Sequence, residues 1–207
     1  MIAYYGNIIF YKLIGENMGN TSLWKNSTSY KVDGVTKHKP EYTQWYGMKD
    51  RVERGVGNYR NVKLSENLKS YDFWCDWVKS QKGFGNRESS GSLWAIDKDI
   101  VGDGSIYHED VCVFVPQILN VFLTQRKPSK LPRGVNLNAT GRYMAKSSEF
   151  KEEIRLGVYD TVDEALFVYQ ERRLEYLFRL MDIYGDDVDD RVFPSLLLNL
   201  TDSFVVF

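Results

Sequence analysis

The first regular pattern along the chain is helical. Apolar side chains recur every three or four positions in two stretches, separated by a break at 55–58, and this spacing predicts two helices. The stripes consist of Tyr42, Trp45, Met48 and Val52, and then of Leu68, Tyr71, Trp74, Cys75 and Val78. Residues 1–41 show no clear period, and we interpret them as an N-terminal cap without an assigned fold.

Two short apolar runs come next, at 93–96 and 111–115, and each has the length of a buried strand. The Gly-rich and Asp-rich segment 102–105 between them favours a turn. Pro116 suits the first position of a helix, and the apolar residues that follow it predict one through Leu123. The predicted order is therefore strand, loop, strand, helix.

After a Pro-rich and Lys-rich segment at 127–132, the hydrophobic period becomes two. Alternation predicts strands over 135–138 and 142–147, and the run Ile154–Val158 predicts a third. Thr161 and Glu164 form a capping-box pattern that opens a helix through about Met181. Three antiparallel strands with one helix leave one face of the sheet covered and the other face free.

These patterns together predict an α+β fold. They divide the chain into an N-terminal cap at 1–41, a first domain at 42–126, a linker at 127–132, a second domain at 133–184 and an acidic and apolar tail at 185–207. We expect the apolar end of the tail to pack on the body of the protein or on another subunit.

Composition narrows the class of protein. Of 207 residues, 43% are hydrophobic and 27% are charged, which excludes a disordered polar chain, a collagen-like repeat and a coiled coil. No apolar stretch has the length of a membrane span, and the start has no basic region or cleavage site typical of a signal peptide. Cys75 and Cys112 lie among apolar residues, and we interpret them as buried thiols of a cytoplasmic protein.

The net charge of −1 hides a strong asymmetry. Residues 127–156 hold seven Lys and Arg against three Asp and Glu, a local charge of +4, whereas residues 157–207 have a charge of −7. A short basic block of this kind favours a polyanionic partner such as nucleic acid.

Two groups of motifs resemble known families. The segments 96–99, 107–112 and 115–120, which read IDKD, YHEDVC and VPQILN, resemble the ββα-metal core of HNH nucleases of the phage homing-endonuclease type. The segments 133–135, 141–145 and 156–165 are similar to the Apetala-type DNA-binding domain that often follows that core. The resemblance covers about 42–180, and it implies a DNA endonuclease in the host cytoplasm if the chain is phage-encoded.

The resemblance also implies a metal site. Asp97 and Asn120 match the positions that hold the divalent metal, Mg²⁺ or Mn²⁺, whose preferred ligands are oxygen atoms. Lys98 stands where the family has its general-base His, and we expect it to hold a phosphate oxygen instead. His108 is the candidate for the base, because an imidazole ordinarily titrates near neutral pH. The alternatives are a strand-end Asp97, an exposed helical Asn120 and an exposed loop His108.

For the second domain, the resemblance implies that the free sheet face enters the major groove of double-stranded DNA. The residues expected to contact DNA are polar or basic and alternate along the strands; they are Arg133, Asn136, Asn138, Arg142, Lys146 and Arg155, with Met144 on the same face. A solvated sheet face would also be polar, but it would not need to be cationic.

Three functions remain open from the sequence. The first is a metal-dependent HNH-type endonuclease. The second is a DNA-binding protein of the same descent that has lost catalysis, because Lys98 and Val111 depart from the HNH pattern. The third is an interaction or structural phage protein that binds a partner, or a second copy of itself, through the tail at 185–207.

Overall fold

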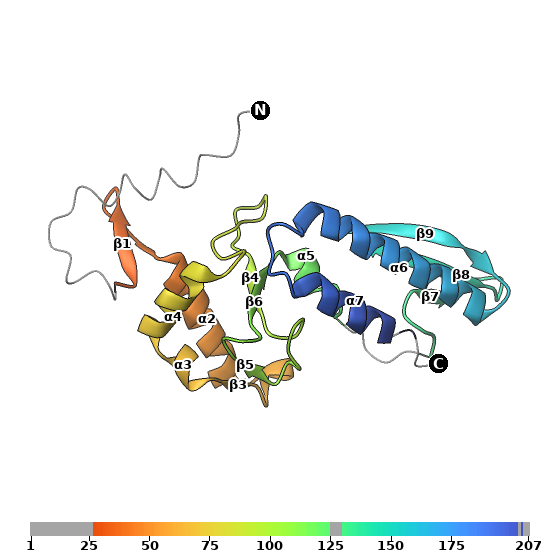
Figure 1. Cartoon of the computed structure of the whole chain (residues 1–207). Coiled ribbons are helices and arrows are strands. Elements are labelled where there is room, and N and C mark those ends of the chain that lie inside the picture. Colours follow the sequence, from red (N-terminus) through yellow and green to blue (C-terminus); the bar gives the residue numbers. More distant parts are fainter. Residues whose placement is uncertain (1–26, 125–129, 203, 205–207) are drawn as a thin grey trace.

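The computed structural model describes residues 27–124, 130–202 and 204 (Figure 1). Its fold is α+β, as the sequence patterns predict, with small sheets and helices along the whole described chain. Most of the N-terminal cap and half of the Pro-rich linker, residues 127–129, lie outside the described residues.

The described part of the N-terminal region begins with a hairpin that the hydrophobic pattern did not predict. Strands β1 (Ser29–Val32) and β2 (Val35–His38) pair antiparallel. Asp33 and Gly34 connect them with φ values of 51° and 79°. An Asp-Gly pair in this left-handed conformation is a preferred two-residue turn of a hairpin. The Asp33-Gly34 pair was therefore the sequence feature that could have predicted this hairpin.

The helical stripes fold as expected in one case and differently in the other. Helix α2 (Pro40–Arg54) contains the first stripe. The second stripe was predicted as one helix, and this prediction is wrong: it forms α3 (Glu66–Lys69) and α4 (Tyr71–Trp77), followed by the 3₁₀ turn Val78–Ser80. The reason is Ser70, which ends α3 and caps α4 by accepting a hydrogen bond from the Phe73 N–H at 3.3 Å.

The middle of the chain contains an antiparallel strand pair followed by a short helix. Strands β4 (Ala95–Asp97) and β6 (Val113–Val115) pair in register, and α5 (Gln117–Asn120) follows directly after Pro116. The helix is one turn long and ends before the predicted Leu123. Between β4 and β6, strand β5 (Ile106–Tyr107) pairs parallel with β3 (Lys63–Leu64), which joins this unit to the N-terminal helices.

The second half of the chain contains the predicted three-stranded antiparallel sheet. Its order is β7 (Val135–Leu137), β8 (Tyr143–Glu149) and β9 (Glu152–Tyr159), with a β-bulge where Ala145 and Lys146 pair with β9. Helix α6 (Val162–Tyr184) covers one face of the sheet. Its start has the predicted capping box, in which Thr161 and Glu164 exchange hydrogen bonds.

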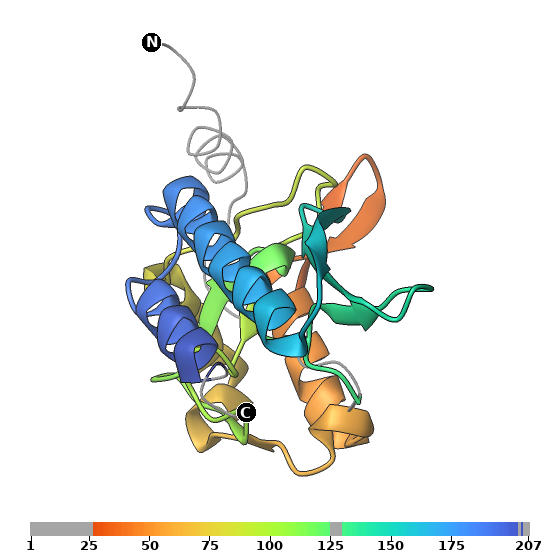
Figure 2. The same ribbon diagram turned by 90° about the vertical axis from the view of Figure 1, so that its right-hand side faces the viewer.

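Helix α7 (Val192–Asp202) lies beside α6 on the side away from the sheet (Figures 1 and 2). One core, which we call the shared core, contains residues of the segment 94–122, which includes β6 and α5, together with residues of α6 and α7. Its buried side chains include Trp94, Val113, Val115, Leu119, Phe122, Tyr176, Leu177, Leu180, Val192, Leu196 and Leu200. The described part of the tail therefore packs on the body of the protein.

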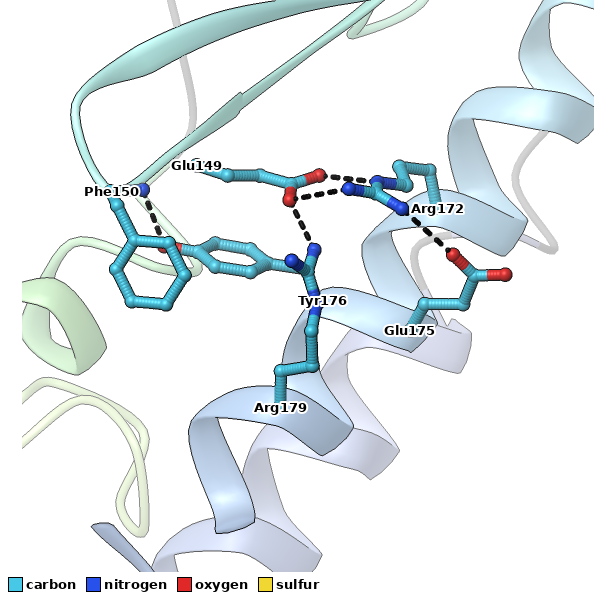
Figure 3. A network of polar contacts seen from close by, with 6 residues as sticks. All are labelled: Glu149, Phe150, Arg172, Glu175, Tyr176 and Arg179. Atoms are coloured by element: carbon cyan, nitrogen blue, oxygen red, sulfur yellow. Dashed lines mark hydrogen bonds and ion pairs between the residues drawn. The ribbon is translucent and has the colours of Figure 1, made fainter. Parts of the chain in front are cut away.

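An ion network around the buried carboxylate of Glu149 fixes the β8–β9 hairpin to α6 (Figure 3). The carboxylate of Glu149 accepts hydrogen bonds from Arg172 Nε at 2.7 Å and Nη2 at 3.0 Å, and also from Arg179. Burial raises the pKa of Glu149, but the hydrogen bonds from both arginines outweigh it and hold the pKa below its usual range. The neighbouring Phe150 N–H donates to the Tyr176 hydroxyl at 3.0 Å.

Candidate nucleic-acid interface and nuclease site

The free face of the β7–β9 sheet is organised in rows that run across the strands. In the central row, Met144 of β8 pairs with Asn136 of β7 and with Val158 of β9. In the next row, Lys146 pairs with Arg155. The opposite face carries Val135 and Ala145, which are buried under α6, so alternation places the central row and the Lys146–Arg155 row on the side away from the helix.

Acidic residues reduce the positive charge of this face. Lys146 Nζ lies 2.9 Å from Glu153 Oε1, and Arg142 Nε lies 2.7 Å from Asp160 Oδ1. In the described part of the chain, Arg155 is exposed and makes no ion pair within 4.0 Å. The face is therefore a mixed polar surface, and its Arg155 is available to an added ligand.

Two of the predicted DNA-contacting residues lie at the edge of the sheet. Asn138 starts the β7–β8 turn, and its Oδ1 accepts hydrogen bonds from the N–H groups of Thr140 at 3.0 Å and Arg142 at 2.9 Å. This oxygen holds the turn, so the amide of Asn138 is partly committed to structure. Arg133 is exposed in the turn that leads into β7.

At the end of β4, Asp97 is buried, with 4% of its surface exposed. Its Oδ1 accepts hydrogen bonds from the N–H groups of Asp99 at 2.8 Å and Ile100 at 2.7 Å. Burial raises the pKa of the Asp97 carboxyl, and the two backbone hydrogen bonds oppose that rise. The carboxylate therefore caps the loop that leaves β4.

Lys98 points into the protein and is 5% exposed. Its Nζ lies 2.7 Å from Asp99 Oδ1 and 5.6 Å from the ring centroids of Tyr59 and Tyr107. The guanidinium of Arg51 contacts the same two rings and donates a hydrogen bond to the Tyr107 hydroxyl at 3.3 Å. These three partners of Lys98 were not predicted from the sequence, because tertiary contacts bring Arg51, Tyr59 and Tyr107 there.

His108 lies in the loop between β5 and β6 and is partly exposed. Its Nδ1 accepts a hydrogen bond from the Asp110 N–H at 3.2 Å. Carboxylate oxygens of Glu109 and Asp110 lie 3.7 Å and 3.5 Å from the same nitrogen. Glu109 is itself fixed by Ser65, whose hydroxyl donates to Oε2 at 2.8 Å, so the loop is tied to the start of α3.

Asp97 and Asn120 are the residues that the resemblance assigns to a divalent metal. Asn120 is the last residue of α5, which packs beside β4, so the structure places both predicted ligands in neighbouring elements. One oxygen of Asp97 is already engaged by backbone N–H groups and the side chain is buried. Within residues 27–124 and 130–202, no three His, Cys, Asp or Glu side chains are grouped as metal ligands.

Comparisons of the chain with protein-family models, with curated proteins and with solved structures return no match. Among the helices that the structure describes, none combines the length and apolar character needed to cross a membrane.

Proposed function

We propose that this chain binds double-stranded DNA through the free face of the β7–β9 sheet. The observation that carries the proposal is the arrangement of this face, on which Asn136, Met144, Lys146 and Arg155 stand together with α6 behind the sheet. A narrow antiparallel sheet fits the width of the major groove, where amide and guanidinium groups read base edges. The proposal does not depend on the metal site.

Charge substitutions on the sheet face test the proposal by fluorescence anisotropy with a labelled duplex over a salt series. Arg155→Ala should weaken binding by about tenfold to a hundredfold if the arginine contacts a base. Lys146→Ala should weaken binding and reduce the salt dependence, because one phosphate contact is lost.

Glu153→Gln is the matched charge variant, because it removes the carboxylate 2.9 Å from Lys146 while keeping the size of the side chain. We expect it to strengthen DNA binding. If neither the lysine nor the glutamate variant changes affinity, the interface lies elsewhere; if the unchanged protein binds no duplex, the proposal fails.

A second candidate function is metal-dependent cleavage of DNA. The observation that favours it is the order of β4, β6 and α5, with Asp97 at the strand end and Asn120 on the helix that follows. The burial of Asp97 and Lys98 favours the alternative, a DNA-binding protein without cleavage activity.

Supercoiled plasmid and genomic DNA separate these alternatives when they are incubated with the protein in Mg²⁺, in Mn²⁺ or in EDTA. Cleavage that requires metal and is abolished by Asn120→Ala supports a nuclease. Asn120 is half-buried on a short helix, so the circular dichroism spectrum of this variant must match that of the unchanged protein. Binding without cleavage under all conditions supports a DNA-binding protein without cleavage activity, and absence of both supports an interaction protein.

A further inference from the structure

The central row of the free sheet face has a chemistry different from that of the rows beside it. Met144 is half-buried between Asn136 and Val158, and Val158 is 41% exposed. An apolar pair thus lies in the middle of a face whose neighbouring positions are charged. It faces away from α6, so it adds nothing to the core under the sheet.

We propose that this row reads an A·T base pair by contact with the thymine methyl group. The proposal rests on the DNA-binding function proposed above and assigns specificity within that surface. The C5-methyl group of thymine is the one apolar feature that a base pair presents in the major groove. Met144 and Val158 are the apolar side chains at the centre of the face, where a base edge would meet them.

Asn136 supports the same base pair. It is exposed and lies directly beside Met144 across the β7–β8 ladder. A side-chain amide can donate to adenine N7 and accept from adenine N6–H, so an amide next to an apolar pair matches the two halves of one A·T pair. Arg155, in the following row, has the chemistry to bind guanine at a neighbouring position.

A β-bulge creates this row. Strict alternation along β9 would put Arg155, Gly157 and Tyr159 on one face. The register shift opposite Ala145 and Lys146 instead lets Arg155 pair with Lys146 and Val158 pair with Met144. The bulge therefore places a cation and an apolar side chain of the same strand on the same face.

The test replaces thymine by uracil, which removes only the methyl group. A pool of short duplexes with a randomised centre is selected on the full-length protein, and the selected sequences are then prepared with thymine or with uracil. We expect the selected pool to be enriched in A·T pairs at a fixed position. Uracil should weaken binding by about threefold to fivefold for each methyl group that the protein buries.

Two conservative variants assign the effect to the row. Val158→Ser removes both methyl groups of the side chain and Met144→Gln keeps the length of the side chain while making it polar. Both positions face away from the core, so folding should be retained. Each variant should bind thymine-containing and uracil-containing duplexes with more nearly equal affinity than the unchanged protein. Lys146→Ala is the control, and it should weaken binding to both duplexes by the same factor.

The outcomes separate this inference from the proposed function. Equal affinity of the unchanged protein for thymine-containing and uracil-containing duplexes would overturn the methyl contact while leaving DNA binding in place. A preference for thymine that both variants retain would also overturn it, because the contact would then lie outside the row. Failure to select any duplex would reject the proposed function itself.

Discussion

The carboxylate of Asp97 holds the backbone that leaves β4, since one oxygen accepts two N–H groups in a buried position. We expect Asp97→Ala to lower the free energy of unfolding by about 2–3 kcal/mol, because two buried N–H groups lose their acceptor. Asp97→Asn keeps an oxygen at that position and should be at least as stable as the unchanged protein at neutral pH. Urea unfolding followed by tryptophan fluorescence measures both variants.

The pH dependence gives this prediction a second readout. Burial raises the pKa of Asp97 in the folded protein, so its contribution to stability is lost as the pH rises from the usual aspartate value through the raised pKa. Asp97→Asn lacks this dependence. If the Asn and Ala variants lose equal stability, the capping role is wrong.

The contribution of Glu149 to stability depends on pH with the opposite sign. Its pKa is lowered in the folded protein, so its contribution to stability is present above the usual glutamate pKa of about 4.3 and is lost as the pH falls through the lowered value. Glu149→Gln should lower the free energy of unfolding by about 2 kcal/mol at neutral pH. The difference from the unchanged protein should shrink on acidification.

Glu175→Gln is the matched control for Glu149. Glu175 also pairs with Arg172, at 3.1 Å, but its side chain is 64% exposed. Exposed pairs contribute little, and this variant should change the free energy of unfolding by less than about 0.5 kcal/mol. Equal effects of the two substitutions would mean that burial of Glu149 does not determine the strength of the network.

At the scale of elements, sequence patterns predicted what local periodicity and turn chemistry determine. The apolar spacing of three and four identified α2, the alternation identified β7 and β8, and the Thr161 capping box identified the start of α6. The β3–β5 pair was not predictable, because each strand has two residues and they pair across a long stretch of chain. Alternation could not place Val158 beside Met144 either, because the β-bulge between Arg155 and Gly157 changes the face on which the residues of β9 lie.

The turn between β8 and β9 is strained at its second residue. Phe150 and Lys151 have φ values of 47° and 71°, a region that favours glycine. The ring of Phe150 packs against Tyr176 at 5.3 Å between centroids, which stabilises the turn in this position. Lys151→Gly should raise the free energy of unfolding by about 0.5–1 kcal/mol, because it removes strain without losing that contact.

Glu152→Gly tests whether this gain depends on backbone conformation. Glu152 follows directly but begins the regular strand β9, where a glycine weakens the strand. Thermal unfolding should show a higher midpoint for Lys151→Gly and a lower one for Glu152→Gly. A lower midpoint for both would show that the turn is not strained at Lys151.

At the scale of the whole molecule, the strand pair β4–β6 and the sheet β7–β9 are connected through α6. Its first half covers the sheet, and its second half lies in the shared core with α5 and α7 (Figure 2). Arg173 strengthens this connection, because its buried guanidinium stacks 3.8 Å from the Phe122 ring centroid and donates to the Phe122 carbonyl at 2.7 Å. The candidate DNA-binding face and the Asp97 region are thus held in one packed structure.

Leu196 of α7 is fully buried in the shared core, whereas Leu198 is 62% exposed. Leu196→Ala should lower the free energy of unfolding by about 3 kcal/mol, because it opens a cavity among residues from both halves of the chain. Hydrogen exchange should then become faster together in β6, in α5 and in the second half of α6. Leu198→Ala removes the same atoms from the surface and should change neither measurement. If only the amides of α7 exchange faster in Leu196→Ala, this helix is a peripheral addition, and the two halves of the molecule do not depend on it for their packing.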